Sequence, residues 1–130
     1  MTLPAPEVCP CGSHRAYAQC CMPYHTGSAI PASAEALMRS RYTAYVLENA
    51  AYLQATWHPS KLPPQFALAG QERVQWLALQ VKRHENSDDD HAVVEFVARY
   101  KINGRAHRLH EVSRFVREHG RWYYLDGELD

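Results

Sequence analysis

The spacing of hydrophobic residues changes near the middle of the chain. From Ser33 to Trp57, apolar residues recur every three or four positions, a period that is typical of amphipathic helices. Ser33 is a favourable N-cap and Asn49 marks a break, so the pattern predicts two consecutive helices. The prolines from Pro59 onward end this helical region, and residues 65–73 are expected to form one more short helix. The apolar stripe consists of Leu37, Met38, Tyr42, Tyr45, Val46, Tyr52 and Leu53.

From Trp76 onward the apolar residues alternate with polar ones, which is the period of half-buried strands. The polar run over residues 86–90 predicts a turn. Asn103-Gly104 predicts a tight hairpin, because both residues tolerate positive φ, and His119-Gly120 predicts another turn. Helices followed by strands predict an α+β fold, in which the helices pack on a curved antiparallel sheet of about four strands.

Composition and charge narrow the function classes. The chain has 130 residues, of which 46% are hydrophobic and 22% charged, as expected for one globular domain with a small appendage. Fourteen basic residues balance fourteen acidic ones, which disfavours a basic nucleic-acid-binding protein. No apolar run approaches the roughly 20 residues that cross a bilayer, so no membrane partner is expected. Residues 1–7 lack the features of a secretory signal, so we expect a cytoplasmic location.

The cysteines divide the chain into parts. All four lie between residues 9 and 21, so we expect a cysteine knuckle over residues 1–25, a connector over residues 26–32 and a core-forming body over residues 33–130. The spacing is Cys-x-Cys-x8-Cys-Cys, and two such pairs joined by a loop can supply the four thiolates of a tetrahedral zinc site. The knuckle has no core of its own, so metal binding would supply most of its folding free energy. The sequence therefore predicts one structural zinc per chain, bound by Cys9, Cys11, Cys20 and Cys21.

Three other interpretations of the cysteines are weaker. Disulfides need an oxidising compartment, a redox dithiol is usually Cys-x-x-Cys at a helix start, and four clustered inert thiols would be a coincidence. His14 and His25 are alternative ligands, but four thiolates already complete the shell, so we expect both histidines beside the site or on the surface. A complete thiolate shell has no open position, which disfavours a catalytic zinc.

These residues resemble a known motif. Cys9-Pro10-Cys11-Gly12-Ser13, Tyr17 and Cys20-Cys21 resemble the SEC-C motif, a zinc knuckle found at the C-terminal tail of the bacterial preprotein translocase ATPase and in many uncharacterised bacterial proteins. In this chain His14-Arg15 stands where the motif often has Gly-Lys. The body resembles the YchJ-like uncharacterised bacterial family, in which the knuckle precedes an NTF2-like domain. The segments that carry this resemblance are residues 37–45, 52–53 with 56–59, 95–98, 111–115 and 120–127.

The resemblance implies an NTF2-like (cystatin-like) cone, a fold that leaves a cavity between helices and sheet, but it implies no reaction. Arg41 lies on the apolar stripe of its helix, and Glu111 shares a strand face with Leu109. If both point inward they should meet, because an unpaired buried charge is too costly. We therefore predict a hydrogen-bonded Arg41–Glu111 pair, which would either tie helix to sheet or clamp an anionic ligand.

Aromatic residues and one histidine complete the candidate site. Tyr45 and Trp57 are expected in the core and the cavity wall. His58 follows the second helix, where it would either cap the helix C-terminus or act as a general base. The candidate pocket residues are therefore Arg41, Tyr45, Trp57, His58 and Glu111.

Two functions compete. The first is a binding or adaptor protein whose zinc knuckle docks on a protein partner and whose cone holds a small ligand. The alternative is a small cavity enzyme, a hydrolase or isomerase, with His58 or Glu111 as the acid or base. The sequence contains no recognisable set of nucleophile, base and orienting group, which favours the first function. Zero net charge disfavours nucleic acid as the partner of the knuckle.

Overall fold

The computed structural model describes residues 6–64, 66 and 74–129 of the 130-residue chain. Helical elements come first and strands follow, which confirms the predicted α+β organisation. The helical elements are η1 (Tyr17–Gln19, a 3-10 helix), α1 (Met22–Thr26), α2 (Ala34–Val46) and α3 (Ala50–Ala55). The strands are β1 (Gln75–Asn86), β2 (His91–Ile102), β3 (Arg105–Glu118) and β4 (Arg121–Leu129).

The strands form one antiparallel sheet in the order β1-β2-β3-β4, so each strand pairs with its neighbour in sequence. The predicted turns join them. Asn103 and Gly104 have φ values of 52° and 77°, and His119 and Gly120 have 54° and 78°. These are the left-handed conformations that tight hairpins require. A register shift in the β3–β4 pairing, between Arg114 and Phe115, changes which β4 residues face the helices.

Side-chain caps define the two main helices. Ser33 Oγ accepts a hydrogen bond from the Ala36 amide at 3.1 Å, so Ser33 caps the N-terminus of α2. Asn49 Oδ1 accepts from the Tyr52 amide at 3.2 Å and begins α3. The sequence therefore placed both helices correctly, but α3 ends before Trp57, which instead forms a bridge to Tyr124. Apart from Phe66, the helix predicted over residues 65–73 lies outside the described residues.

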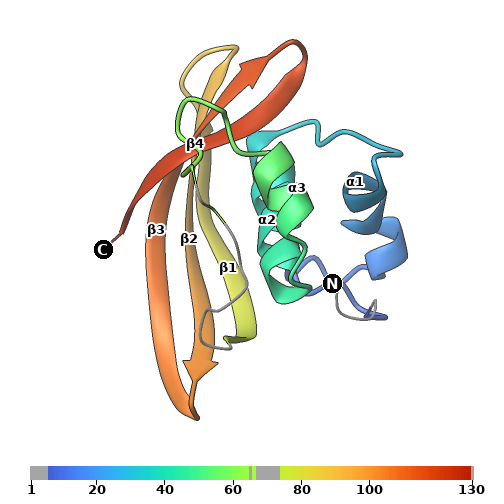
Figure 1. Cartoon of the computed structure of the whole chain (residues 1–130), viewed down its shortest axis with the longest axis vertical. Coiled ribbons are helices and arrows are strands. Elements are labelled where there is room, and N and C mark those ends of the chain that lie inside the picture. Colours follow the sequence, from blue (N-terminus) through green and yellow to red (C-terminus); the bar gives the residue numbers. More distant parts are fainter. Residues whose placement is uncertain (1–5, 65, 67–73, 130) are drawn as a thin grey trace.

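The main core lies between α2 and one face of the sheet, and both α2 and α3 stand on that face (Figure 1). The apolar stripe of α2 packs against alternate residues of β2 and β3, which explains the two periods of the sequence. None of the helices in the described segments has the length and apolar character needed to span a membrane. The buried core residues are Ala34, Leu37, Met38, Tyr42, Ala92, Val94, Phe96, Ala98, Phe115 and Trp122.

The knuckle has a second, smaller core. Its buried residues are Cys9, Cys11, Tyr17 and Cys21, which pack with Leu47 at the end of α2. The segment lies beside α2 and α3, away from β3 and β4 (Figure 1). The knuckle is therefore docked on the body.

Candidate metal centre and cone pocket

Four thiols meet in the knuckle. Their sulfur atoms all lie within 4.8 Å of one another, with 3.6 Å between Cys11 and Cys20 and 4.0 Å between Cys20 and Cys21. None of the four forms a disulfide. Sulfurs at the corners of a tetrahedron around zinc, each about 2.3 Å from the metal, stand about 3.8 Å apart. The cluster therefore has the donor atoms and the spacing to hold a metal ion.

The thiols of the cluster shift one another's pKa values. Hydrogen bonds from Cys21 and Cys9 lower the pKa of the Cys11 thiol well below its ordinary value. The same contact with Cys11 raises the pKa of Cys21, and burial raises it further. Several thiolates in this buried place would repel one another. A bound cation would remove that repulsion, so the donor set fits a metal ion.

Hydroxyl groups lie around the sulfurs. Ser13 Oγ is 3.1 Å from the Cys20 sulfur, and Thr43 Oγ1 on α2 is 3.6 Å from the Cys9 sulfur. Both distances allow hydrogen bonds to sulfur. Such contacts would orient thiolate ligands and reduce their charge.

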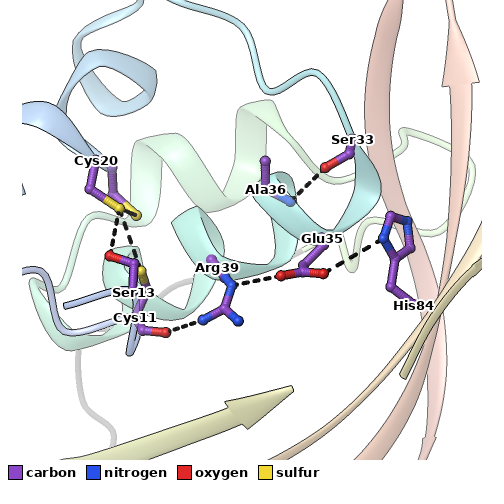
Figure 2. A network of polar contacts seen from close by, with 9 residues as sticks. Cys11, Ser13, Cys20, Ser33, Glu35, Ala36, Arg39 and His84 are labelled. Atoms are coloured by element: carbon purple, nitrogen blue, oxygen red, sulfur yellow. Dashed lines mark hydrogen bonds and ion pairs between the residues drawn. The ribbon is translucent and has the colours of Figure 1, made fainter. Parts of the chain in front are cut away.

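Arg39 links the knuckle to the rest of the fold. Its Nη1 donates to the Cys11 carbonyl at 2.6 Å, and its Nε donates to Glu35 Oε2 at 3.0 Å (Figure 2). Glu35 Oε1 in turn lies 3.7 Å from Nδ1 of His84 on β1. One line of polar contacts therefore runs from the cysteine loop across α2 to the sheet.

Gly12 allows the cysteine loop to approach the sheet closely. Its φ of +85° is unfavourable for other residues, and a Cβ there would lie 3.0 Å from the Leu79 carbonyl oxygen. The motif therefore needs glycine at this position both for the turn and for close packing against the sheet.

The two histidines near the cysteines lie outside the cluster of candidate ligands found among the described residues. His14 is exposed. His25 accepts a hydrogen bond from the Tyr17 hydroxyl at Nδ1 (2.7 Å) and donates from Nε2 to the Ser40 carbonyl (2.8 Å). Burial lowers the pKa of His25, which favours the neutral ring that this pattern needs. His25 therefore holds the knuckle on α2.

A second candidate site is a partly open cavity of about 270 Å³ between α2 and the sheet, called the pocket below. This volume is near the lower limit of small-molecule sites, which span about 300–1,000 Å³. Most of its wall is aromatic or aliphatic. The lining residues are Met38, Arg41, Tyr42, Tyr45, Trp57, Trp76, Phe96, Ala98, Leu109, Glu111, Ser113, Phe115 and Tyr124.

Arg41 is the buried cation of the pocket, with 5% of its surface exposed. Its Nη1 donates to the Leu53 carbonyl at 2.8 Å and to Thr56 Oγ1 at 2.7 Å. The guanidinium lies over the rings of Tyr124, at 4.6 Å, and Trp57, at 5.2 Å. Burial lowers the pKa of Arg41. Among the described residues, its Nε and Nη2 have no hydrogen-bond partner.

Glu111 lies on β3, in the wall of the same pocket. Its Oε2 accepts hydrogen bonds from Ser113 and, at 3.2 Å, from the Tyr124 hydroxyl. No hydrogen bond or ion pair joins Arg41 to Glu111, although the structure describes both residues, so the predicted pair is wrong. Burial did require partners for both charges, but a backbone carbonyl and neutral hydroxyls provide them.

His58 lies outside the residues that line the pocket. Its Nε2 is 3.0 Å from Glu118 Oε2, and its Nδ1 is 2.7 Å from Ser60 Oγ. These ring contacts do not reach the last carbonyls of α3. The structure thus brings Arg41, Tyr45, Trp57 and Glu111 together and leaves His58 apart.

Sequence reasoning missed Tyr124 and Thr56 as partners of the two charged groups. Thr56 contacts Arg41 because α3 ends just before it, and helix ends are hard to locate from a short pattern. The β3–β4 register shift lies beside Tyr124, and strand alternation gives no sign of such a shift.

The fold and the cysteine cluster define a class of protein: a small NTF2-like α+β domain preceded by a four-cysteine knuckle. Family models support both parts, since "YchJ, middle NTF2-like domain" matches residues 33–127 and "SEC-C motif" matches residues 6–23. The chain belongs to the UPF0225 (YchJ) family, which confirms the resemblance and the fold expected from the sequence.

Similar proteins come from several bacteria. A UPF0225 protein of Ralstonia nicotianae is 56% identical, over 98% of this chain and 96% of the relative. One from Cupriavidus metallidurans is also 56% identical, over 98% and 92%. Among solved structures, a SEC-C motif containing protein from Rhodopseudomonas palustris has a TM-score of 0.84 and 36% identity, over 93% of this chain and 97% of that one. Another, from Psychrobacter arcticus, has a TM-score of 0.77 and 28% identity, over 97% and 84%.

Proposed function

We propose that this chain is a zinc-stabilised binding protein, in which zinc holds the knuckle together and the pocket takes a small ligand. The observation that carries the binding role is Arg41. A buried guanidinium, two of whose nitrogens have no hydrogen-bond partner in the described part of the chain, lies in the wall of a partly open aromatic cavity. An acceptor group on a ligand in this mostly apolar cavity would form charge-assisted hydrogen bonds with these two nitrogens.

The chemistry of the cysteine cluster supports zinc as the metal. Thiolates are soft ligands, and four of them at tetrahedral spacing suit zinc in a structural site. Such a site has no open position, so its role would be to stabilise the knuckle. Elemental analysis of protein purified without added metal should find close to one zinc per chain. A trace amount, or stoichiometric iron in its place, would reject zinc.

Binding is favoured over catalysis because the two acid/base candidates do not share a site. His58 pairs with Glu118 outside the pocket, and Glu111 is engaged by Ser113 and Tyr124. The alternative, a hydrolase or isomerase, would have to work with Glu111 alone. A general base acting alone typically contributes about 10²–10⁴-fold to a rate.

The ligand role is testable by NMR with a set of small aromatic fragments. Trp57 and Trp76 lie in the pocket wall, so their indole NMR signals should shift when a fragment binds. Ala98 also lines the pocket, so Ala98→Leu should fill part of it and abolish the shifts while the fold is retained. If no fragment moves the pocket signals of the wild-type protein, the proposed binding role fails.

A protein partner at the knuckle is the second part of the proposal. His14, Arg15 and Ala18 are exposed on the outer side, and Val8 is 62% exposed. These residues are free for contact, whereas the cysteines pack against the body. Capture of the same partner by the wild type and by His14→Ala/Arg15→Glu would contradict this part. A cytoplasmic location is proposed with it, because thiolates persist in a reducing compartment.

A further inference from the structure

In each of the two charged side chains of the pocket, only one polar atom has hydrogen-bond partners among the described residues. Arg41 donates through Nη1, and Glu111 accepts through Oε2. Arg41 Nε and Nη2, and Glu111 Oε1, have no hydrogen-bond partner among the described residues. None of these three atoms is sealed from solvent, since the one fully buried side-chain atom without a partner in the described segments is His84 Nε2. A ligand in the pocket can therefore reach both a cationic donor and an anionic acceptor.

No other side chain charged at neutral pH lines the pocket among the described residues. The tyrosines of the wall stay neutral, because burial raises the pKa of Tyr42 to about 12 and also raises the pKa values of Tyr45 and Tyr124. The formal charge of the pocket is therefore zero, with its positive and negative groups at separate places in the wall. Apart from Ser113, the rest of the lining is apolar or aromatic.

This charge pattern selects among ligands. A ligand with only a carboxylate would be attracted by Arg41 but repelled by the negative charge of Glu111 in a poorly solvated place. A ligand with only an ammonium group would be attracted by Glu111 but repelled by Arg41. A zwitterion can place its carboxylate on Arg41 and its ammonium on Glu111, and its apolar part can pack on rings such as Tyr42 and Trp76.

We infer that the pocket binds a small zwitterion with an aromatic or apolar body, of the aromatic amino-acid class. This inference rests on the proposed binding role and adds the class of ligand. The Arg41 edge selects the carboxylate, Glu111 selects the ammonium, and the aromatic wall selects the side chain.

Three probes that share a phenyl ring and differ in charge test the inference. They are L-phenylalanine, which is a zwitterion, 3-phenylpropanoate, which is an anion, and 2-phenylethylammonium, which is a cation. Titration of the zinc-loaded wild type, followed by tryptophan fluorescence and calorimetry, should give a dissociation constant for phenylalanine at least about tenfold lower than for either other probe, a difference of about 1.4 kcal/mol.

Glu111→Gln should abolish the preference for phenylalanine over 3-phenylpropanoate, because it removes the negative charge and keeps the shape of the side chain. In this variant 3-phenylpropanoate should bind at least as tightly as phenylalanine. Glu118→Gln is the matched control, since it removes a carboxylate that pairs with His58 outside the pocket, and it should leave the preference unchanged. Arg41 substitutions are less useful, because Arg41 also holds the end of α3.

The outcomes separate the inference from the proposed function. If wild-type protein prefers 3-phenylpropanoate, or if Glu111→Gln leaves the preference unchanged, the zwitterion class is wrong and the binding role stands. If none of the three probes binds while other fragments shift the pocket signals, again only the class is wrong. If neither the probes nor the fragments bind, both proposals fail.

Discussion

The position of the Glu111 carboxylate depends on the absence of a side chain at Gly127. A Cβ at Gly127 would lie 2.8 Å from Glu111 Cδ and 2.9 Å from Cγ. Gly127→Ala should therefore push the carboxylate away from Ser113 and Tyr124. We expect the free energy of unfolding to fall by about 1 kcal/mol, because hydrogen bonds to the half-buried carboxylate are lost.

Chemical denaturation measures this change, and a double variant supplies the control. Gly127→Ala combined with Glu111→Ala removes the overlap, so it should be about as stable as Glu111→Ala alone. A Gly127→Ala protein as stable as the wild type would show that the carboxylate does not need this space.

His25 should make stability depend on pH. Its folded pKa lies below the ordinary value of 6.5, mainly because of burial. The groups around it are the Tyr17 hydroxyl, the Ser40 carbonyl and the Tyr52 ring, and burial raises the pKa values of both tyrosines. None of these neighbours titrates near pH 6.

Between its folded and unfolded pKa values His25 binds more protons when the chain is unfolded, so its contribution is complete above about pH 6.5 and is lost as pH falls through the folded pKa. The melting temperature should therefore drop more steeply for the wild type than for His25→Asn between about pH 7 and pH 5. Parallel profiles for the two proteins would contradict this role of His25.

At the level of residues, the sequence predicted which groups are buried better than it predicted their partners. Helical spacing correctly placed Arg41 on the inner side, because spacing alone determines which face of a helix a residue occupies. Its partners are Leu53 and Thr56, which depend on where α3 ends. Cysteine spacing did identify four sulfurs that meet, because ligand pairs in a short loop have little freedom.

Among the elements, α2 serves both candidate sites. Arg39 and Thr43 contact the knuckle, whereas Arg41 and Tyr45 line the pocket. Residues four apart share a helix face and residues two apart point in different directions, which explains this division. The position of one helix therefore determines the geometry of both sites.

The N-cap of α2 should matter for that reason. Ser33→Ala removes the acceptor for the Ala36 amide, and we expect a loss of about 1 kcal/mol in the free energy of unfolding. Ser33→Asp is the matched control, because aspartate also caps well and should restore most of the stability. Equal stability of Ser33→Ala and the wild type in denaturant would contradict the capping role.

The long elements were predictable from the sequence, whereas the shortest ones were not. The strands and α2 extend over enough residues for their period to be clear, and the hairpin turns carry residues that accept positive φ. The helices η1 and α1, with three and five residues, are too short to establish a period. Their positions follow from the fold of the knuckle around its cysteines, which is a tertiary constraint.

For the whole molecule, removal of the metal should affect the two parts differently. The body has its own buried core, whereas the small core of the knuckle consists largely of the cysteines. Chelation should therefore disorder residues up to about 25 and release the Arg39 contact with Cys11, while the sheet and α2 stay folded. An amide NMR spectrum before and after chelation measures this. Loss of all dispersed signals would mean that knuckle and body form one cooperative unit.

We propose above that a closed zinc site stabilises the knuckle. X-ray absorption at the zinc edge, on protein purified without added metal, identifies the ligand atoms of such a site. A closed thiolate site should show four sulfur ligands at about 2.3 Å, with no nitrogen or oxygen in the shell. Cys20→Ser should change this to three sulfurs and one lighter ligand. A wild-type shell that contains histidine nitrogen or water, or a protein without zinc, would contradict a closed zinc site.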